Sequence, residues 1–273
     1  MPIKSSHRKE GGSMTKGTIR GREAFMAKLS SGLGRQAVPT QPPAHPNRGV
    51  PDFYKEIAWT TEEKIEAFSR NWTALTGKVL VVEEAEARAK IGEWLREIAA
   101  ELGVTGVSRW EHEGLKALGL DETLAADGIP VVPWRPIGEG SPLAPDPAAA
   151  ASAVGPGWAR RSALLRRTER CELGVVWPDY AVAGTATLVL QCSPHRGRSV
   201  SLLTSTLFAV FRADQLVTRM GEAFAHLSRG TETPEQYASS INLITGPSRS
   251  ADIENDLTIG IHGPGNVYAV IIK

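Results

Sequence analysis

Residues 60–110 read TTEEKIEAFSRNWTALTGKVLVVEEAEARAKIGEWLREIAAELGVTGVSRW, and this stretch decides the fold. Apolar residues recur at helical spacing over residues 60–75 and again over 83–102. A short strand is predicted after each helix, a buried one over residues 78–82 and another over residues 104–110. The alternation of helices and strands predicts an α/β fold, with a mostly parallel sheet flanked by helices.

The first of these helices shows which face it buries and how it begins. Ile65, Phe68 and Trp72 lie on one side of the helix, with a polar side opposite them. Thr61 is the expected cap residue, because it stands just ahead of the acidic pair Glu62 and Glu63 in the first turn. The sequence therefore predicts a helix that packs one face against a core.

Toward the N-terminus the composition changes. Residues 1–16 are polar and are predicted to be disordered. Residues 17–58 hold a short helix, expected over 19–31, and an extended Pro-rich arm that includes residues 39–51. Residues 59–273 are predicted to form a single α/β domain.

Toward the C-terminus the chain is richer in strands. Residues 136–157 contain many Pro, Ala and Gly residues and are predicted to be irregular. Residues 213–227 are predicted to form a helix that begins near Asp214. Further strands are expected at the β-branched and aromatic runs over residues 186–190, 207–211, 241–245 and 267–272.

The residue inventory excludes several classes of protein. The 273 residues carry a formal net charge of +1, which gives no general attraction to nucleic acid or to an anionic membrane. An iron–sulfur cluster normally needs four thiolates, but the chain has two cysteines, Cys171 and Cys192. No window approaches eighteen apolar residues, so no membrane span is expected. A cytoplasmic protein without a cofactor or metal of its own is the expectation.

The segment most suggestive of binding follows the strand expected at residues 241–245. Gly246, Ser248, Arg249, Ser250 and Asp252 lie where that strand passes through a turn into a helix expected over residues 251–257. The N–H groups of a helix N-terminus and a planar guanidinium suit a carboxylate or a phosphate. A capped turn, with Arg249 paired to Asp252 or Glu254, explains the pattern equally well.

Three other segments supply weaker candidates. His262 lies in the Gly-rich segment over residues 260–265 and suits anion binding or proton transfer, although a structural histidine is the favoured interpretation. Thr185 lies at the entrance to a strand, where its hydroxyl would line a polar pocket, although a tight turn followed by a core strand explains the segment at least as well. Arg198 belongs to a basic loop over residues 193–199 that suits a phosphate, although such loops are mostly solvated.

The motifs together resemble a known family. The segments DYAVAGTATLVL over residues 179–190, RSVSLL over 198–203, INLITGPSRSADIE over 241–254 and GIHGP over 260–264 are similar to the lactate-utilisation protein C family, whose domain is the LUD domain. The order and spacing fit across residues 171–273. The short helix near the N-terminus also resembles the family's opening helix.

The resemblance implies a fold similar to the ribose-5-phosphate isomerase and coenzyme A transferase group. It also implies a role in oxidising L-lactate to pyruvate, in which iron–sulfur partner proteins carry the redox centres. The chain departs from the family pattern where the family usually has Glu and Gly in an A-E-T-G-T element, because Gly184 and Ala186 stand there. It departs again after the Leu-Leu pair, where Thr204 and Leu207 replace the usual Pro and His.

Three functions follow as hypotheses. The favoured one is an accessory protein of a lactate-oxidising system that binds a small carboxylate or phosphate ligand, iron–sulfur partners, or both. The second is an independent enzyme acting on a sugar phosphate or an acyl-coenzyme A, which rests on analogy of fold. The third is a ligand-binding protein without catalysis.

Overall fold

The computed structural model describes residues 20–41, 54, 56–135, 164–229, 233, 236–251 and 257–273. The disorder expected over residues 1–16, the irregular segment over 136–157 and most of the Pro-rich arm lie outside these residues. The chain divides into two units, Met1–Glu56 and Ile57–Lys273. No helix in the described ranges combines the length and the apolar character that crossing a bilayer requires.

The first unit contains one described helix, α1 (Arg22–Gly32). It overlaps the helix that the sequence predicted over residues 19–31. Its apolar side chains Phe25 and Leu29 are largely exposed. Among the described residues, none of α1 belongs to a cluster of buried apolar side chains.

The second unit is built on a six-stranded sheet in which every neighbouring pair is parallel, which confirms the predicted α/β fold. Pro133 lies in an outermost strand, where a residue without an N–H is tolerated. In spatial order the strands are β1 (Lys78–Val82), β12 (Asn266–Ile272), β7 (Thr206–Arg212), β4 (Leu173–Val176), β2 (Val107–Trp110) and β3 (Val131–Trp134).

A second, mixed sheet and a separate hairpin complete the strands. The second sheet holds β8 (Leu216–Val217), β5 (Tyr180–Val182), β6 (Thr187–Gln191) and β9 (Ile241–Ile244), in that spatial order. The hairpin pairs β10 (Arg249–Ala251) with β11 (Leu257–Ile259) in antiparallel fashion.

The helices of this unit flank the two sheets. They include α3 (Thr61–Ala74), α4 (Ala87–Leu102), α5 (Glu113–Ala117), α6 (Leu120–Ala126), α9 (Ser199–Leu202) and α10 (Met220–Leu227), with two 3-10 turns, η1 (Glu84–Glu86) and η2 (Ala213–Gln215). Residues 164–168 are also helical.

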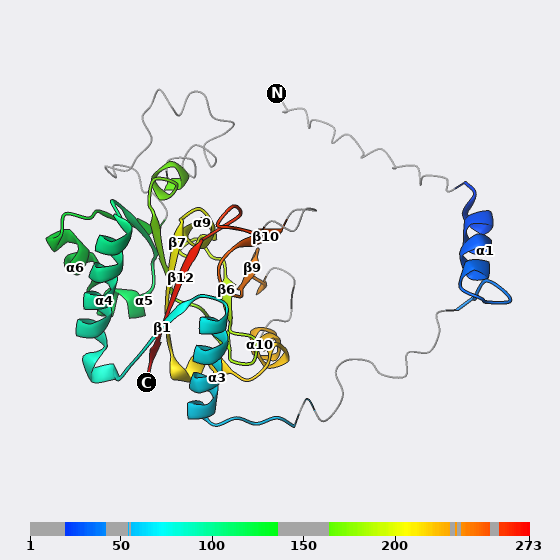
Figure 1. Ribbon diagram of the computed structural model, residues 1–273, viewed down its shortest axis with the longest axis horizontal. Helices are drawn as coiled ribbons and strands as arrows, with labels where there is room; N and C mark the ends of the chain where they lie inside the picture. Colours follow the sequence, from blue (N-terminus) through cyan, green and yellow to red (C-terminus); the bar gives the residue numbers. More distant parts are fainter. Residues whose placement is uncertain are drawn as a thin grey trace, which may run out of the picture. The chain divides into compact units, whose positions relative to one another are not determined.

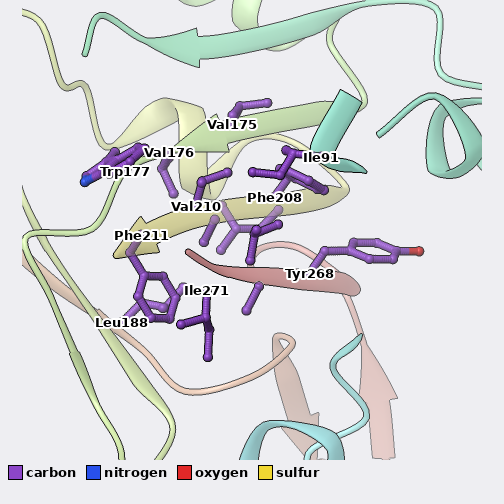
Figure 2. Close-up of a cluster of buried hydrophobic side chains, with 14 of the residues drawn as sticks. Ile91, Val175, Val176, Trp177, Leu188, Phe208, Val210, Phe211, Tyr268 and Ile271 are labelled. Carbon is purple, nitrogen blue, oxygen red and sulfur yellow. The ribbon is translucent and has the colours of Figure 1, made fainter. Parts of the chain in front are cut away.

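The parallel sheet forms the middle layer of this unit (Figure 1). Strand β7 shows this directly, because side chains an odd number of residues apart point to opposite faces of a strand. On one face Phe208 packs against Trp94 of α4, with ring centroids 5.6 Å apart. On the other face Phe211 packs against Phe68 of α3, at 5.3 Å. The second sheet shares the α3 face, where Leu188 lies near Phe211 (Figure 2).

Helix α3 confirms its predicted buried face and corrects its predicted cap. Ile65, Phe68 and Trp72 are buried as expected. The cap residue is Thr60 rather than Thr61, because its hydroxyl accepts from the Glu63 N–H while the Glu63 carboxylate accepts from the Thr60 N–H. This reciprocal pair fixes the first turn one residue earlier than the acidic pattern suggested.

The helix predicted over residues 213–227 is wrong in its first half. Residues 213–215 form η2, Leu216 and Val217 form β8, and the helix begins only at Met220. Leu216 and Val217 instead pair in parallel with Ala181 and Val182 of β5. Tertiary pairing therefore outweighs the helical pattern in this segment.

One strained residue ends α3 and allows a stability test. Thr76 has a φ of 70°, and a β-branched residue rarely adopts the left-handed region. We expect Thr76→Gly to stabilise the protein by about 0.5–1 kcal/mol, because glycine relieves that strain but gains entropy when unfolded. Thermal unfolding measures the change. Thr73→Gly, at an exposed helical position three residues earlier, is the control and is expected to destabilise slightly.

Candidate functional site

The site is defined first by the direction of the chain at the ends of two neighbouring strands. Strand β2 leads outward to β3, whereas its neighbour β4 leads through the second sheet to β7 on the opposite side. Adjacent parallel strands whose connections leave in opposite directions open a crevice at their carboxyl ends, and ligands of open α/β sheets bind there. The carboxyl ends of β2 and β4 are therefore the place to look for a site.

A cavity of about 490 Å³ lies at this place. Polar and aromatic residues supply most of its lining, which includes His112 after β2 and Trp177 and Asp179 after β4. Its charged lining residues are Arg196 and Arg229 against the single carboxylate of Asp179. The volume is within the range of small-molecule sites. The excess of arginine favours a negatively charged ligand.

Asp179 and Arg196 form the charged pair of the cavity. Arg196 Nη1 donates to Asp179 Oδ1 at 2.8 Å, and the Gln191 N–H donates to Asp179 Oδ2 at the same distance. The carboxylate is held by backbone on one oxygen and holds the guanidinium with the other. Arg196 is therefore held in one orientation, and its other guanidinium N–H groups make no hydrogen bond within the described residues.

The loop that carries Arg196 is tied to the end of β2. The Glu111 N–H donates to the His195 carbonyl at 3.0 Å, and the Trp110 indole N–H donates to the Gly197 carbonyl at 2.9 Å. These bonds connect the basic loop with the strand that ends beside His112. Arg196 of this loop lines the cavity, whereas Ser193, Pro194, His195 and Arg198 are exposed, as the favoured interpretation of a solvated loop expects.

Gln215 braces the turn that follows β4. Its Nε2 donates to the carbonyls of Pro178 and Asp179 at 2.7 and 3.1 Å. Its Oε1 accepts from the Trp177 indole N–H at 2.9 Å and from the Arg212 N–H at 2.8 Å. Both ends of the amide are thus used to hold the turn that positions Asp179.

His112 is fixed by its ring and by one ring nitrogen. Its ring stacks on Trp177 with centroids 4.8 Å apart, and its Nδ1 accepts from the Gly114 N–H at 3.1 Å. Burial lowers the pKa of His112, the Arg196 charge lowers it further, and Asp179 and Glu113 partly oppose this. The ring is therefore held in its neutral form with the proton on Nε2.

The cavity lining includes a second imidazole, that of His226. His226 of α10 packs edge-on against Tyr180 of β5, with ring centroids 5.2 Å apart. No group of three or more His, Cys, Asp or Glu side chains suited to a metal occurs in the described part of the chain. The arrangement offers cations and neutral donors, a combination that binds an anion carrying further oxygen atoms.

The family model of the LUD domain matches residues 65–272, which includes every strand of both sheets and the whole cavity lining. The chain belongs to the LUD domain family. This confirms the family that the motifs of the sequence resemble.

Several relatives of this LUD protein carry the name "Lactate utilization protein C". The protein of Bacillus velezensis is 26% identical over 262 residues, which cover 95% of this chain and 99% of the relative. That of Bacillus subtilis is 28% identical over 266 residues, with the same two shares. That of Anoxybacillus flavithermus is 39% identical over 108 residues, which cover 40% of this chain and 47% of the relative.

A solved structure is also similar to this chain. It is a DUF162 family protein from Deinococcus radiodurans, with a TM-score of 0.48 and 15% sequence identity. The likeness covers 79% of this chain and all of that protein.

The loop predicted to bind an anion is folded differently from the expectation. Residues 249–251 form β10, paired with β11, so the helix predicted over residues 251–257 is wrong at its start and Ser250 is not its cap. Asp252 lies outside the described residues. Arg249 Nη2 donates to the Leu75 carbonyl at 2.7 Å. Binding by these residues stays a prediction, without the helix N-terminus on which it was based.

Ser248 and His262 do lie together, as their sequence spacing suggested. The His262 N–H donates to Ser248 Oγ at 3.2 Å, and the Ser248 N–H donates to the Pro264 carbonyl at 2.8 Å. The Gly265 N–H in turn bonds to the carbonyl of Ser205, the residue before β7. The loop therefore lies at the amino end of the parallel sheet, opposite the edge where the LUD cavity opens.

Thr185 and Gly246 meet at the second sheet. The Thr187 hydroxyl lies 2.7 Å from the hydroxyls of both Thr185 and Thr245, and Gly246 follows directly. Ala186 has a φ of 48°, which glycine adopts without strain, so the glycine usual in the LUD family has a physical reason here. Gly184, in place of the usual Glu, leaves no side chain at an exposed position.

The predictions from sequence missed the residues that line the cavity and named Arg198, a neighbour of Arg196, instead. Arg198 is exposed and does not line the cavity, whereas Arg196 of the same loop does. His112 and Asp179 received no role. Each follows a buried strand within three residues, and that position at the carboxyl end of a strand is the signal that would have found them.

Proposed function

We propose that this chain acts in lactate utilisation as an accessory protein. In this proposal it binds a small carboxylate in the cavity at the carboxyl ends of β2 and β4. The role is supported by the relatives named "Lactate utilization protein C", which match 95% of this chain. The ligand is supported by one observation above others: Arg196, held by Asp179, lines a cavity whose charged residues are two arginines against one carboxylate.

The oxidation itself falls to partners in this proposal. Converting a hydroxy acid to a keto acid removes two electrons, which an iron–sulfur protein can carry away. The two cysteines of this chain are too few for a cluster of four thiolate ligands. Iron–sulfur partner proteins are therefore proposed to supply the redox centre, while this chain supplies binding.

The size of the cavity favours a second candidate function. A volume of about 490 Å³ exceeds what an acid of three carbons fills. An enzyme that acts on a sugar phosphate or an acyl-coenzyme A would use this space, and the same arginines would hold its phosphate. Titration with a phosphosugar beside the simple acids discriminates between the two candidates.

Removing the guanidinium tests where the anion binds. We expect Arg196→Gln to weaken the binding of pyruvate by at least about tenfold, because a charge-assisted hydrogen bond contributes roughly 1.5–3 kcal/mol. Isothermal titration calorimetry on the full chain measures the affinity. Arg70→Gln removes the same charge from an exposed helical site outside the cavity lining and is the matched control.

A third variant separates the two locations. If Arg249→Gln abolishes binding and Arg196→Gln leaves it intact, the anion binds at the Ser248 loop and the cavity is not the site. If Arg196→Gln and Arg249→Gln both bind pyruvate as tightly as the Arg70→Gln control, neither location is the binding site.

A further inference from the structure

His112 is the cavity residue whose hydrogen-bonding state the structure fixes. Its Nδ1 accepts the Gly114 N–H, so the proton of the neutral ring must be on Nε2. Within the described residues Nε2 has no hydrogen bond of its own. A histidine in this state presents one N–H donor and no positive charge.

The surroundings keep His112 in place beside the arginine. Trp177 stacks on one ring face, and the N–H of Gly114 donates to Nδ1, so a flip of the ring breaks the hydrogen bond and a swing of the ring breaks the stacking. His112 and Arg196 line the same cavity, close enough for the arginine charge to act on the imidazole. The neutral N–H donor of His112 therefore lies in the same cavity as the Arg196 guanidinium, whose orientation Asp179 fixes.

We propose that His112 is a specificity-determining residue, which donates from Nε2 to an uncharged oxygen on a ligand whose carboxylate is bound by Arg196. The substrate class is then a 2-oxo or 2-hydroxy carboxylate rather than an unsubstituted acid. This inference rests on the proposed function, since it needs a carboxylate in the cavity, and it adds the feature by which that carboxylate is chosen.

Three acids that differ only at the second carbon test the inference. Pyruvate, L-lactate and propionate share a carboxylate and a three-carbon chain. We expect wild-type protein to bind pyruvate and lactate about fivefold to tenfold more tightly than propionate, the size of effect that one neutral hydrogen bond gives. Calorimetric titration on the full chain measures all three affinities.

Two variants remove the donor at Nε2 and preserve different parts of its setting. His112→Phe retains a ring to stack on Trp177. His112→Asn retains an oxygen able to cap α5, and its NH₂ takes the place of ring Cδ2, short of the position of Nε2. In both, we expect the preference for pyruvate over propionate to fall to about one, because only pyruvate loses a hydrogen bond. Loss of affinity for all three acids in equal proportion would show a structural role and would overturn the inference.

The dependence on pH gives an independent readout. The charged groups that act on His112 are Arg196, Asp179 and Glu113, and His226 and Arg229 line the same cavity. A neutral donor predicts that the pyruvate-to-propionate ratio stays constant from pH 6.5 to pH 8. A ratio that falls tenfold per pH unit would show an imidazolium at work and would overturn the inference.

The outcomes separate this inference from the proposed function. Equal binding of pyruvate and propionate by the wild type overturns the role of His112 and leaves the carboxylate site standing. Absence of binding for all three acids overturns the carboxylate site, and the role of His112 with it.

Discussion

Gly174→Ala is expected to destabilise the protein by about 3 kcal/mol or more. Gly174 lies in β4, and a Cβ atom added there would lie 1.9 Å from the carbonyl oxygen of Val200 and 2.8 Å from Thr204 Oγ1. The Val200 oxygen belongs to the backbone of α9 and cannot rotate away, so the helix or the strand must move. Overpacking a core in this way costs typically 1–3 kcal/mol and sometimes more.

Urea unfolding of this variant beside a matched one measures the effect. Gly221→Ala makes the same chemical change in α10, where an added Cβ meets no atom within 4 Å. That control is expected to be neutral or stabilising by up to about 1 kcal/mol, because alanine favours a helix. If Gly174→Ala is as stable as Gly221→Ala, then α9 does not pack on β4 as closely as described.

The variant also bears on the cavity. Strand β4 ends at Val176, and the next residues are Trp177 and Asp179 of the lining. A shift of β4 would therefore displace Asp179, the residue that orients Arg196. We expect a weaker affinity for carboxylates in the fraction of Gly174→Ala that remains folded.

The architecture of the parallel sheet was predictable because its signals are local. Residues 267–272 form a continuous apolar run, which is typical of a strand buried on both faces, and residues 79–82 form a shorter run in the outermost strand β1. The helices that flank them carry apolar residues at helical spacing, and Ile91, Leu95 and Ile98 on one face of α4 are buried. Each of these helices and strands can therefore be predicted from its own segment of sequence.

The errors came where pairing between distant segments decided the structure. Residues 249–254 carry the pattern of a capped helix start, yet Arg249, Ser250 and Ala251 pair with residues 257–259 as a hairpin. Leu216 and Val217 form a strand of only two residues, which is too short to show a period. In both places the local pattern was compatible with a helix and the partner strand was invisible in the sequence.

The cavity could be located only from the order of the strands in the sheet, and not from the sequence motifs. His112, Asp179 and Arg196 lie far apart in the chain and meet because β2 and β4 are neighbours whose connections diverge. The order of strands in a sheet is not written in any one segment. The basic loop was noticed from sequence, but choosing Arg196 over Arg198 required knowing which side chain faces Asp179.

Gln215→Glu is expected to destabilise the protein by about 2–4 kcal/mol at pH 7. The substitution retains an oxygen to accept from Trp177 and Arg212, but it replaces the NH₂ that donates to Pro178 and Asp179. A carboxylate oxygen would then face two carbonyl oxygens at hydrogen-bonding distance. Two carbonyl acceptors that lose their donor and face an ionised carboxylate lower the free energy of unfolding by roughly this amount.

The pH dependence of this variant has a definite sign. The two carbonyls disfavour the ionised form, so the pKa of the introduced carboxyl is raised in the folded protein. A raised folded pKa gives stability that is present below the unfolded value, about 4.3, and is lost as pH rises through the folded value. The stability of Gln215→Glu relative to wild type should therefore improve as pH is lowered from 7 toward 4.

Gln191→Glu is the control for the added charge. It places a carboxylate on the wall of the same cavity, and the bond that Gln191 makes to Asp179 uses the backbone N–H and is retained. We expect it to cost less than about 1 kcal/mol. Similar destabilisation in both variants would mean that charge in the cavity, and not the loss of the Gln215 amide, is responsible.

The same pair of variants connects the brace with binding. Losing the Gln215 amide releases the turn that carries Asp179, so Arg196 loses the carboxylate that aims it. For Gln215→Glu we therefore expect pyruvate affinity to recover at low pH together with stability, since protonation restores a donor to the turn. Affinity that stays low while stability recovers would show that Gln215 supports the fold without positioning Arg196.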